Sequence, residues 1–178
     1  MERKIINTRQ ECPGRLVPVG TPVTIPSNCF VTLTQSLGGS YTVVYEGNMI
    51  RIDGIDAEAL GFESFKLEYP ARVPGPAYKE DVWNTLRTIY DPEIPVNIVD
   101  LGLIYDVHLT DSQTSSDVSL VMTLTAPGCG MGPVLIDDIK ARLGRAPNVN
   151  DVKVELVFEP PWSREMMSEE AQLELGLY

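Results

Sequence analysis

Cys129 stands in a segment whose composition suits thiol chemistry. It follows the alternating segment 118–125 and precedes Pro133, where a helix is expected to begin, by four positions. The unpaired N–H groups and the dipole at a helix N-terminus favour a nearby thiolate. Glycines at 128, 130 and 132 keep side-chain bulk away from the sulfur. The segment therefore predicts an accessible, reactive thiol, and the alternative is a small hydrophobe that fills a turn.

A threonine pair precedes this cysteine. Thr123 and Thr125 are two positions apart and are expected on the same face of a strand. The hydroxyl of Thr125, four positions before Cys129, could then hydrogen-bond a sulfur or a bound ligand. The alternative is that both threonines simply favour the strand.

Three carboxylates, those of Asp91, Glu93 and Asp100, flank prolines in one stiffened segment. Hard oxygen ligands of this kind could bind a cation. The alternative is that they end a helix at Asp91 and cap backbone N–H groups at turns.

Several enzyme classes are disfavoured. Leu135 stands six positions after Cys129, where a cysteine phosphatase needs arginine, and no Gly-Lys-Ser/Thr triplet marks a nucleotide-binding loop. A cysteine hydrolase needs a histidine base, and His108, the single histidine, would have to reach Cys129 from a neighbouring strand. His108 is more simply an exposed or core-edge residue. The chain is therefore expected to be non-catalytic.

The composition limits partners and compartment. The 178 residues carry a net charge of -11, which disfavours nucleic acid and anionic membranes as partners. No apolar run approaches the roughly 18 to 20 residues that cross a bilayer, and no signal peptide is evident at the start. Three cysteines, at 12, 29 and 129, cannot all pair within the chain. A soluble, cytoplasmic protein is expected.

The first 70 residues predict a small β-rich module. Short strands are expected at 21–25, 30–34, 41–46 and 49–52, with turns at Gly38-Gly39 and at Gly47-Asn48. Three prolines in the segment 70–76 cannot extend a helix or a central strand, so a linker is expected at 71–78.

Residues 79–178 predict a compact domain of order α-β-β-α-β-α. The expected elements are a helix at 79–90, strands at 103–109 and 118–124, a helix at 133–143, a strand at 152–158 and a short helix opened by Ser168. The last strand must run parallel to its predecessor through a right-handed crossover. The chain is thus expected to be an α+β protein with a mixed sheet of three or slightly more strands.

Two motifs and the helix after them closely resemble the iron-sulfur assembly domain family. The motifs are DPEIPVNIVDLGLIY at 91–105 and MTLTAPGC at 122–129. That family occurs in bacterial assembly factors and in subunits of the eukaryotic cytosolic cluster-targeting machinery, and the segment 128–133 is most similar to its SufT branch. The resemblance implies a role in maturing iron-sulfur proteins, with Cys129 as the reactive or cluster-contacting residue and with Asp91, Glu93, Asp100 and Thr125 at matching motif positions.

One cysteine cannot hold an iron-sulfur cluster that normally has four protein ligands. We therefore expect a homodimer that places two Cys129 thiolates together and carries a labile cluster or iron to apo-client proteins, in contact with other assembly proteins. The alternative is an adaptor that docks clients without binding a cluster. A family member serving one metabolic oxygenase is a third reading, but such proteins carry cysteines near the chain end, and none follows Cys129.

Overall fold

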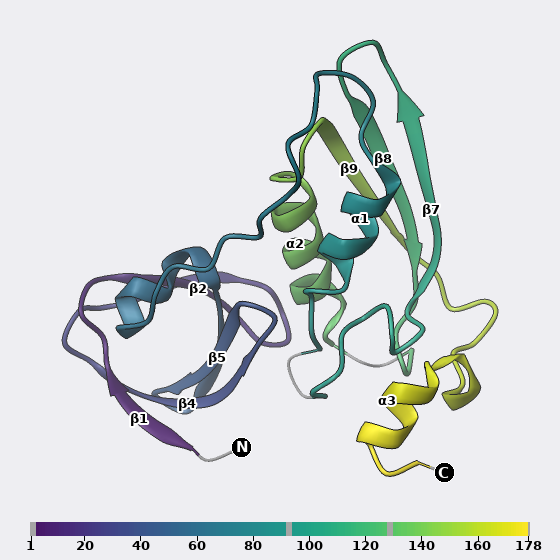
Figure 1. Ribbon diagram of the computed structural model, residues 1–178. Helices are drawn as coiled ribbons and strands as arrows, with labels where there is room; N and C mark the ends of the chain where they lie inside the picture. Colours follow the sequence, from purple (N-terminus) through teal and green to yellow (C-terminus); the bar gives the residue numbers. More distant parts are fainter. Residues whose placement is uncertain (1–2, 92–93, 128–129, 178) are drawn as a thin grey trace.

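The computed structural model describes residues 3–91, 94–127 and 130–177, which form two β-sheets with associated helices (Figure 1). The first sheet has six antiparallel strands in the order β1-β4-β5-β6-β2-β3. Its strands are β1 (Lys4–Asn7), β2 (Cys12–Leu16), β3 (Pro22–Ile25), β4 (Phe30–Leu37), β5 (Ser40–Tyr45) and β6 (Asn48–Asp53). Alternate side chains of these strands, such as Val31 and Leu33, pack into one hydrophobic core.

The β-rich start is thus confirmed, with two differences in detail. The β5–β6 turn was predicted at Gly47-Asn48, but Tyr45 pairs with Asn48, so the two turn residues are Glu46 and Gly47. Both have positive φ, 48° and 79°, as a primed hairpin turn requires. The Gly38-Gly39 turn between β4 and β5 lies where it was predicted.

Strands β1 and β2 were not predicted. The sequence of β2 contains Pro13 and Gly14, which by pattern indicate a turn. A Cβ atom on Gly14 would lie 2.5 Å from the Ile50 side chain and 2.9 Å from the carbonyl oxygen of Arg51. This glycine therefore permits a close approach of two strands, which is one reason for glycine within a sheet besides a bend or a bulge.

A short 3-10 helix, η1 (Gly54–Leu60), follows β6, and Asp53 caps it by accepting the Ile55 N–H at 3.2 Å. Residues 61–78 then run to α1 without a helix or strand. The separation of the chain into domains at 71–78 remains a prediction.

The second sheet has three strands in the order β7-β8-β9. It is built from α1 (Lys79–Leu86), β7 (Ile104–Asp111), β8 (Ser116–Met122), α2 (Gly132–Leu143) and β9 (Val149–Leu156), and is followed by the 3-10 helix η2 (Arg164–Met166) and by α3 (Glu169–Glu174). Strands β7 and β8 are antiparallel, and β8 and β9 are parallel with α2 between them. Figure 1 shows α1 and α2 on one face of this sheet. The predicted α+β fold with a mixed three-stranded sheet is confirmed.

Helix α1 ends four residues earlier than the predicted 90. The N–H groups of Thr88 and Ile89 bond to Thr85 and Leu86, three residues back, so the helix tightens and stops. The carbonyl of Thr88 instead accepts a hydrogen bond from Arg142 of α2, at 3.0 Å. Pro92, four residues after Thr88, has no N–H to donate to this carbonyl, so the contact with α2 satisfies a group that the helix could not.

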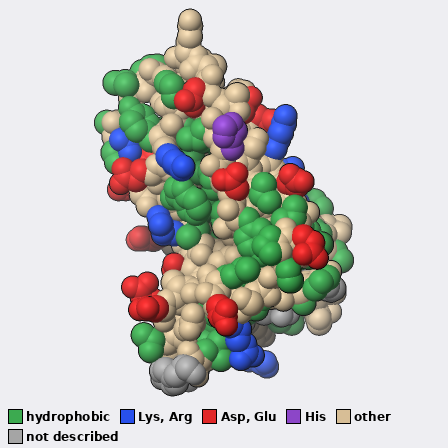
Figure 2. Space-filling view, turned by 90° about the vertical axis from the view of Figure 1, so that its right-hand side faces the viewer, with side chains coloured by type: hydrophobic (Ala, Val, Ile, Leu, Met, Phe, Trp, Pro, Cys, Tyr) green, Lys and Arg blue, Asp and Glu red, His purple; other side chains and the backbone are tan. Residues whose placement is uncertain are grey.

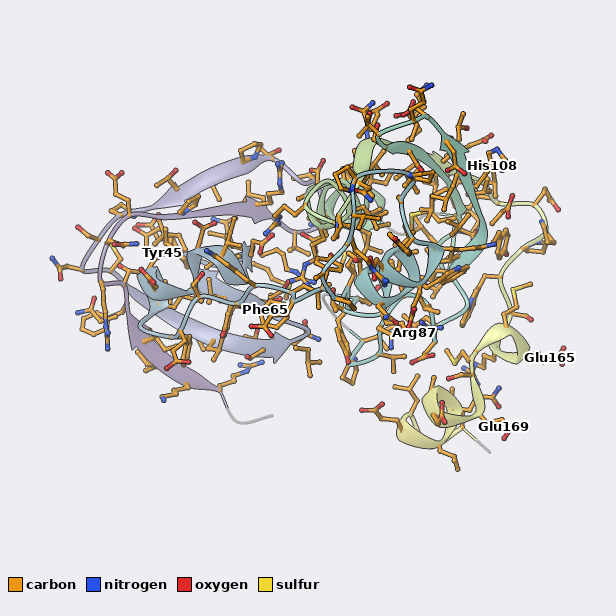
Figure 3. The ribbon with its side chains drawn as sticks, turned by 45° about the horizontal axis from the view of Figure 1, so that its top comes forward. Tyr45, Phe65, Arg87, His108, Glu165 and Glu169 are labelled. Atoms are coloured by element: carbon orange, nitrogen blue, oxygen red, sulfur yellow. The ribbon has the colours of Figure 1, made fainter. Side chains whose placement is uncertain are left out.

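Helix α2 joins the two sheets. Arg142, 6% exposed, donates to the carbonyl of Gly39 at 2.9 Å and also to Gly38 and Ser40 of the β4–β5 turn. Its guanidinium lies 5.8 Å from the ring of Phe65, which Figure 3 shows on the side of the first sheet that faces the second. Three ion pairs extend the junction, namely Arg15–Asp137 at 3.1 Å, Arg51–Asp138 at 3.1 Å and Arg145–Asp53 at 2.7 Å.

Across residues 3–91, 94–127 and 130–177, no helix is both long and apolar enough to cross a membrane.

Candidate functional site

The predicted site surrounds the connection from β8 to α2, of which the structure describes residues 123–127 and 130–131. Cys129, its central predicted residue, and the adjacent Gly128 lie outside the described residues. The geometry of the site is therefore built from what flanks them.

The start of α2 fits the predicted thiol chemistry. Its N-cap residue, Met131, is buried and makes no side-chain capping hydrogen bond, and Pro133 occupies the first turn. The N-cap residue thus leaves the first N–H groups of the helix without a side-chain cap, and such groups together with the helix dipole stabilise a nearby anion. Cys129 precedes the first helical residue, Gly132, by three positions.

The threonine pair lies just past the end of β8, which stops at Met122, so the expectation that both residues belong to the strand is wrong. Thr123 still donates its backbone N–H to the carbonyl of Leu103, at 2.9 Å. Its side chain is fully buried, and its hydroxyl has no hydrogen-bond partner among the described residues. Thr125, whose hydroxyl was predicted to hydrogen-bond a sulfur or a bound ligand, is half-buried within the β8–α2 connection.

Thr123 is therefore a candidate that the sequence prediction did not select. Its two-residue spacing from Thr125 was the available signal, but strand alternation gave no reason to prefer the first hydroxyl. A buried hydroxyl without a partner is costly in a folded protein, and such a group is often explained by a bound species.

The carboxylates of the 91–102 segment serve its turns. The Asp91 carboxylate, in a residue that is 6% exposed, accepts the N–H of Ile94 at 3.0 Å. Asn97 accepts the N–H groups of Val99 and Asp100 and donates to the Asp100 carboxylate at 2.6 Å. The Asp91 carboxylate thus caps a backbone N–H, which is the alternative reading of its sequence, whereas the Asp100 carboxylate accepts from the Asn97 side chain and Asn97 caps the backbone groups. Glu93 lies outside the described residues.

No group of three histidine, cysteine, aspartate or glutamate side chains that could hold a metal ion occurs among the residues that the structure describes. Asp91 and Asp100 are therefore not brought into a ready cation site by described partners. Their role as ligands stays a prediction.

The first sheet and its turns contact the candidate site from one side. A Cβ atom on Gly130 would lie 2.9 Å from the ring of Pro18, and one on Gly20 would lie 3.1 Å from Pro133, so the β2–β3 turn packs directly against the start of α2. The side chain of Gln35, in β4, donates to the carbonyl of Asp91 at 3.3 Å. The N-terminal module therefore contacts both motif segments, which sequence patterns did not predict.

The other two cysteines are placed for structure. Cys12 is fully buried, and its burial together with the negative charge of Asp56 raises the pKa of its thiol to about 11. Cys29 is half-buried and accepts a hydrogen bond from the Tyr45 hydroxyl at 3.6 Å. Both belong to the first sheet and its turns.

His108 is exposed on β7, on the sheet face away from α1 and α2, and pairs across the ladder with Ser119. Figure 2 shows the histidine at the surface among charged side chains of both signs, and Figure 3 places it on the outer side of the second sheet. It is about 17 Å along the strand from Leu103, which bonds Thr123 at the mouth of the β8–α2 connection. This placement disfavours a cysteine–histidine pair.

Comparisons with known proteins agree with the motifs. A family model described as iron-sulfur cluster assembly protein matches residues 79–156. A "Fe-S protein maturation auxiliary factor" from Porphyromonas gingivalis is 50% identical over 98 residues, which are 55% of this chain and 90% of the relative. The "Fe-S protein maturation auxiliary factor SufT" from Staphylococcus aureus is 42% identical over 89 residues, 50% of this chain and 98% of the relative.

A solved structure repeats the fold. The "domain of unknown function DUF59" from Bacillus anthracis is 37% identical, with a TM-score of 0.50 over 56% of this chain and 92% of that one. These proteins are matched over nearly their whole length, whereas they match only about half of this chain.

Proposed function

The chain belongs to the iron-sulfur cluster assembly protein family, and from this premise we propose that it is a non-catalytic auxiliary factor in the maturation of iron-sulfur proteins. In this role it contacts other assembly proteins and apo-client proteins. The family names of its relatives support the general role, and the residues around the β8–α2 connection support a mechanism through Cys129.

The observation that carries the mechanism is the start of α2, whose N-cap residue, Met131, gives the first N–H groups no side-chain cap. A cysteine three positions before such a helix start gains stabilisation of its thiolate, the form that binds iron. The hydroxyl of Thr123, at the same connection, has no hydrogen-bond partner among the described residues and offers a hydrogen bond to a sulfur or to a bridging ligand. In this proposal Cys129 binds a labile cluster or iron as cargo, and the hydroxyl of Thr125 is a further hydrogen-bond partner for it.

Incomplete ligation makes the cargo easy to release. Clusters normally have four protein ligands, and one Cys129 thiolate supplies one of them. Two protomers that bring their Cys129 thiolates together, or a client that supplies its own cysteines, would complete the shell. A homodimer formed in the presence of iron and sulfide is therefore part of the proposal.

Anaerobic reconstitution with iron and sulfide tests it. We expect the desalted wild-type protein to retain iron and to show thiolate-to-iron charge-transfer absorption, and we expect both to be absent from Cys129→Ser. The matched control is Cys29→Ser, which removes a half-buried thiol of the first sheet and should keep the absorption. The carrier mechanism would be excluded if Cys129→Ser retained iron, or if neither the wild type nor Cys129→Ser retained it.

An adaptor is the second candidate, and it is favoured by the absence of three converging metal ligands among the described residues. Such a protein would bring clients to the assembly proteins without holding a cluster. Client-enzyme activity in cells that lack this protein distinguishes the two. Full rescue by Cys129→Ser supports the adaptor, and rescue by wild type alone supports the carrier.

A further inference from the structure

Strand β1 leaves one edge of the first sheet open. It is the end strand of the sheet, and within the part of the chain that the structure describes it pairs with β4 alone. The N–H of Thr8 donates to the carbonyl of Cys29, so alternation along the strand turns the backbone groups of Ile6 toward β4 and those of Ile5 and Asn7 away from it. Figure 1 shows this strand at the rim of the sheet, beside the N-terminus. The outward N–H and C=O groups are a template for one more strand.

A groove follows that edge. It has a volume of about 460 Å³ and is lined by residues 4–9, by Asn28 and by residues 60–62. The groove thus follows the length of this segment. Strand β1 itself gives it four residues of extended chain, about 13 Å, which is long enough for a short peptide strand. Arg9 lies in a bend, and its N–H already donates to the carbonyl of Ala59 at 2.8 Å, so the open backbone groups are those of Ile5 and Asn7.

The opposite wall of the groove is anchored in the fold. Leu60 is buried in the core of the first sheet. The ring of Phe62 stacks on Tyr41 with centroids 5.0 Å apart. The groove is therefore bounded by ordered groups on both sides and is not a gap beside a loose terminus.

The charge of the groove is opposite to that of the molecule. Lys4 and Arg9 lie near its two ends, both exposed, and neither forms an ion pair with a described residue. The guanidinium of Arg9 lies over Gly61, where an added Cβ would come within 2.8 Å of its Nε. Two cations that form no ion pair with a described residue, on one edge of a chain with net charge -11, indicate an acidic occupant.

Apolar groups on the outer face suggest how such a strand is held. Ile5 is 71% exposed and Phe30 is 74% exposed. Asn7 pairs with Phe30 and Ile5 with Thr32, so the side chains of Ile5 and Phe30 are diagonal neighbours on one face. Alternate side chains of an added strand would cover them.

A second copy of the chain fits this edge poorly. Antiparallel pairing of two β1 strands would bring Lys4 and Arg9 of both copies onto one short ladder, and like charges across a ladder destabilise it. We propose that the β1 edge binds an extended, acidic segment of a partner protein by strand addition. The proposal goes beyond the maturation role and does not depend on Cys129.

The direct test is fluorescence polarisation with a labelled peptide in which glutamate alternates with valine and threonine. We expect the full chain to bind this peptide, and to bind it about tenfold more weakly when the salt concentration rises from about 50 mM to about 500 mM. We expect no binding of the same peptide with lysine in place of glutamate. Binding of both peptides alike, or of neither, would overturn the proposal.

Two variants separate backbone from charge. Ile5→Pro removes an N–H that faces the groove and not β4, a position where an edge strand tolerates proline, and should weaken binding by about tenfold while thermal unfolding is kept. Lys4→Glu combined with Arg9→Glu should abolish binding. The matched control reverses two charges elsewhere, with Arg87→Glu and Lys153→Glu. Arg87, labelled in Figure 3, and Lys153 of β9 are both exposed, and this control should leave binding unchanged.

Each remaining outcome is decisive. Equal loss of binding in the control pair would mean that net charge alone attracts the peptide, and the edge site would be rejected. A dimer detected by light scattering that Ile5→Pro dissociates would assign the edge to a second copy, which also overturns the acidic partner.

Discussion

Thr85 and Thr123 are both fully buried but differ in what their hydroxyls contact. The hydroxyl of Thr85 donates to the carbonyl of Asp81 at 2.6 Å and contacts the hydroxyl of Tyr69 at 2.7 Å. The hydroxyl of Thr123 has no partner among the described residues. A buried polar group left unpaired costs about 1–3 kcal/mol, so Thr123 lowers the stability of the protein in the absence of a ligand.

Valine at each position should therefore have opposite effects. We expect Thr123→Val to raise the free energy of unfolding by about 1 kcal/mol, because it removes the unpaired hydroxyl at nearly constant shape. Thr85→Val should lower it by about 1–3 kcal/mol, because the groups of Asp81 and Tyr69 lose a partner. Urea unfolding followed by tryptophan fluorescence measures both, and a loss of stability in both variants would show that Thr123 is satisfied in the folded protein.

Residue types and spacing point to the segment that contains Cys129 and Thr125, because a thiol among glycines before a helix start has a direct chemical meaning, and the role of these two residues stays a prediction. They were not enough to select Thr123. Whether a hydroxyl is paired depends on which groups pack around it in three dimensions, and strand alternation alone does not contain that information.

At the level of elements, the β5–β6 hairpin carries a local strain. Its turn residues have φ of 48° at Glu46 and 79° at Gly47. The left-handed region suits glycine and asparagine, whereas a residue such as glutamate pays a backbone cost there. No atom lies within 4 Å of a Cβ placed on Gly47, so a substitution there would change backbone energy and not packing.

The turn can be improved at one position and damaged at the other. Glu46→Asn should raise the free energy of unfolding by about 0.5–1 kcal/mol, because Asn-Gly is the preferred sequence of this turn. Gly47→Ala should lower it by about 1–2 kcal/mol, since alanine resists positive φ. Thermal unfolding gives both values, and a destabilised Glu46→Asn would mean that the glutamate side chain has a favourable contact that the turn geometry does not reveal.

The same turn shows how far elements can be predicted. The glycine indicated a hairpin, but the position of the turn by one residue depended on the pairing of β5 with β6. The carbonyl of Thr88, just past the end of α1, accepts a hydrogen bond from Arg142, which is distant in sequence. Hydrophobic periodicity gave the existence and type of most elements, whereas their boundaries followed from tertiary contacts.

On the scale of the whole molecule, two hydrophobic cores share few apolar contacts. One core belongs to the first sheet and includes Cys12 and Ile52, and the other belongs to the second sheet and includes Leu120 and Ile139. Polar contacts of α2 join them. Hydrophobic periodicity predicted the helices and strands that form the second core, but the docking of the first sheet on α2 rests on pairs such as Arg51 and Asp138, which no local pattern connects.

Those polar contacts determine whether the two cores unfold together. Arg142 is the most central, since it is 6% exposed and bonds to both the β4–β5 turn and Thr88. The two tryptophans, Trp83 and Trp162, pack against the second core, so their fluorescence reports on it alone. Cys12 reports on the first core, because its thiol is fully buried with a pKa raised to about 11 and reacts only after that core opens.

Pulsed alkylation of Cys12 and tryptophan fluorescence should therefore give the same urea midpoint in the wild-type protein. Arg142→Lys keeps the charge but not the planar set of donors, so the first core should open at a lower urea concentration than the second. The control Arg145→Lys alters a side chain that is 41% exposed and should keep the midpoints together. Separate midpoints in the wild type would mean that the sheets already unfold independently, and coincident midpoints in Arg142→Lys would mean that the remaining ion pairs hold them without it. The difference between the two urea midpoints decides whether the N-terminal module can separate from the start of α2 while the second core stays folded.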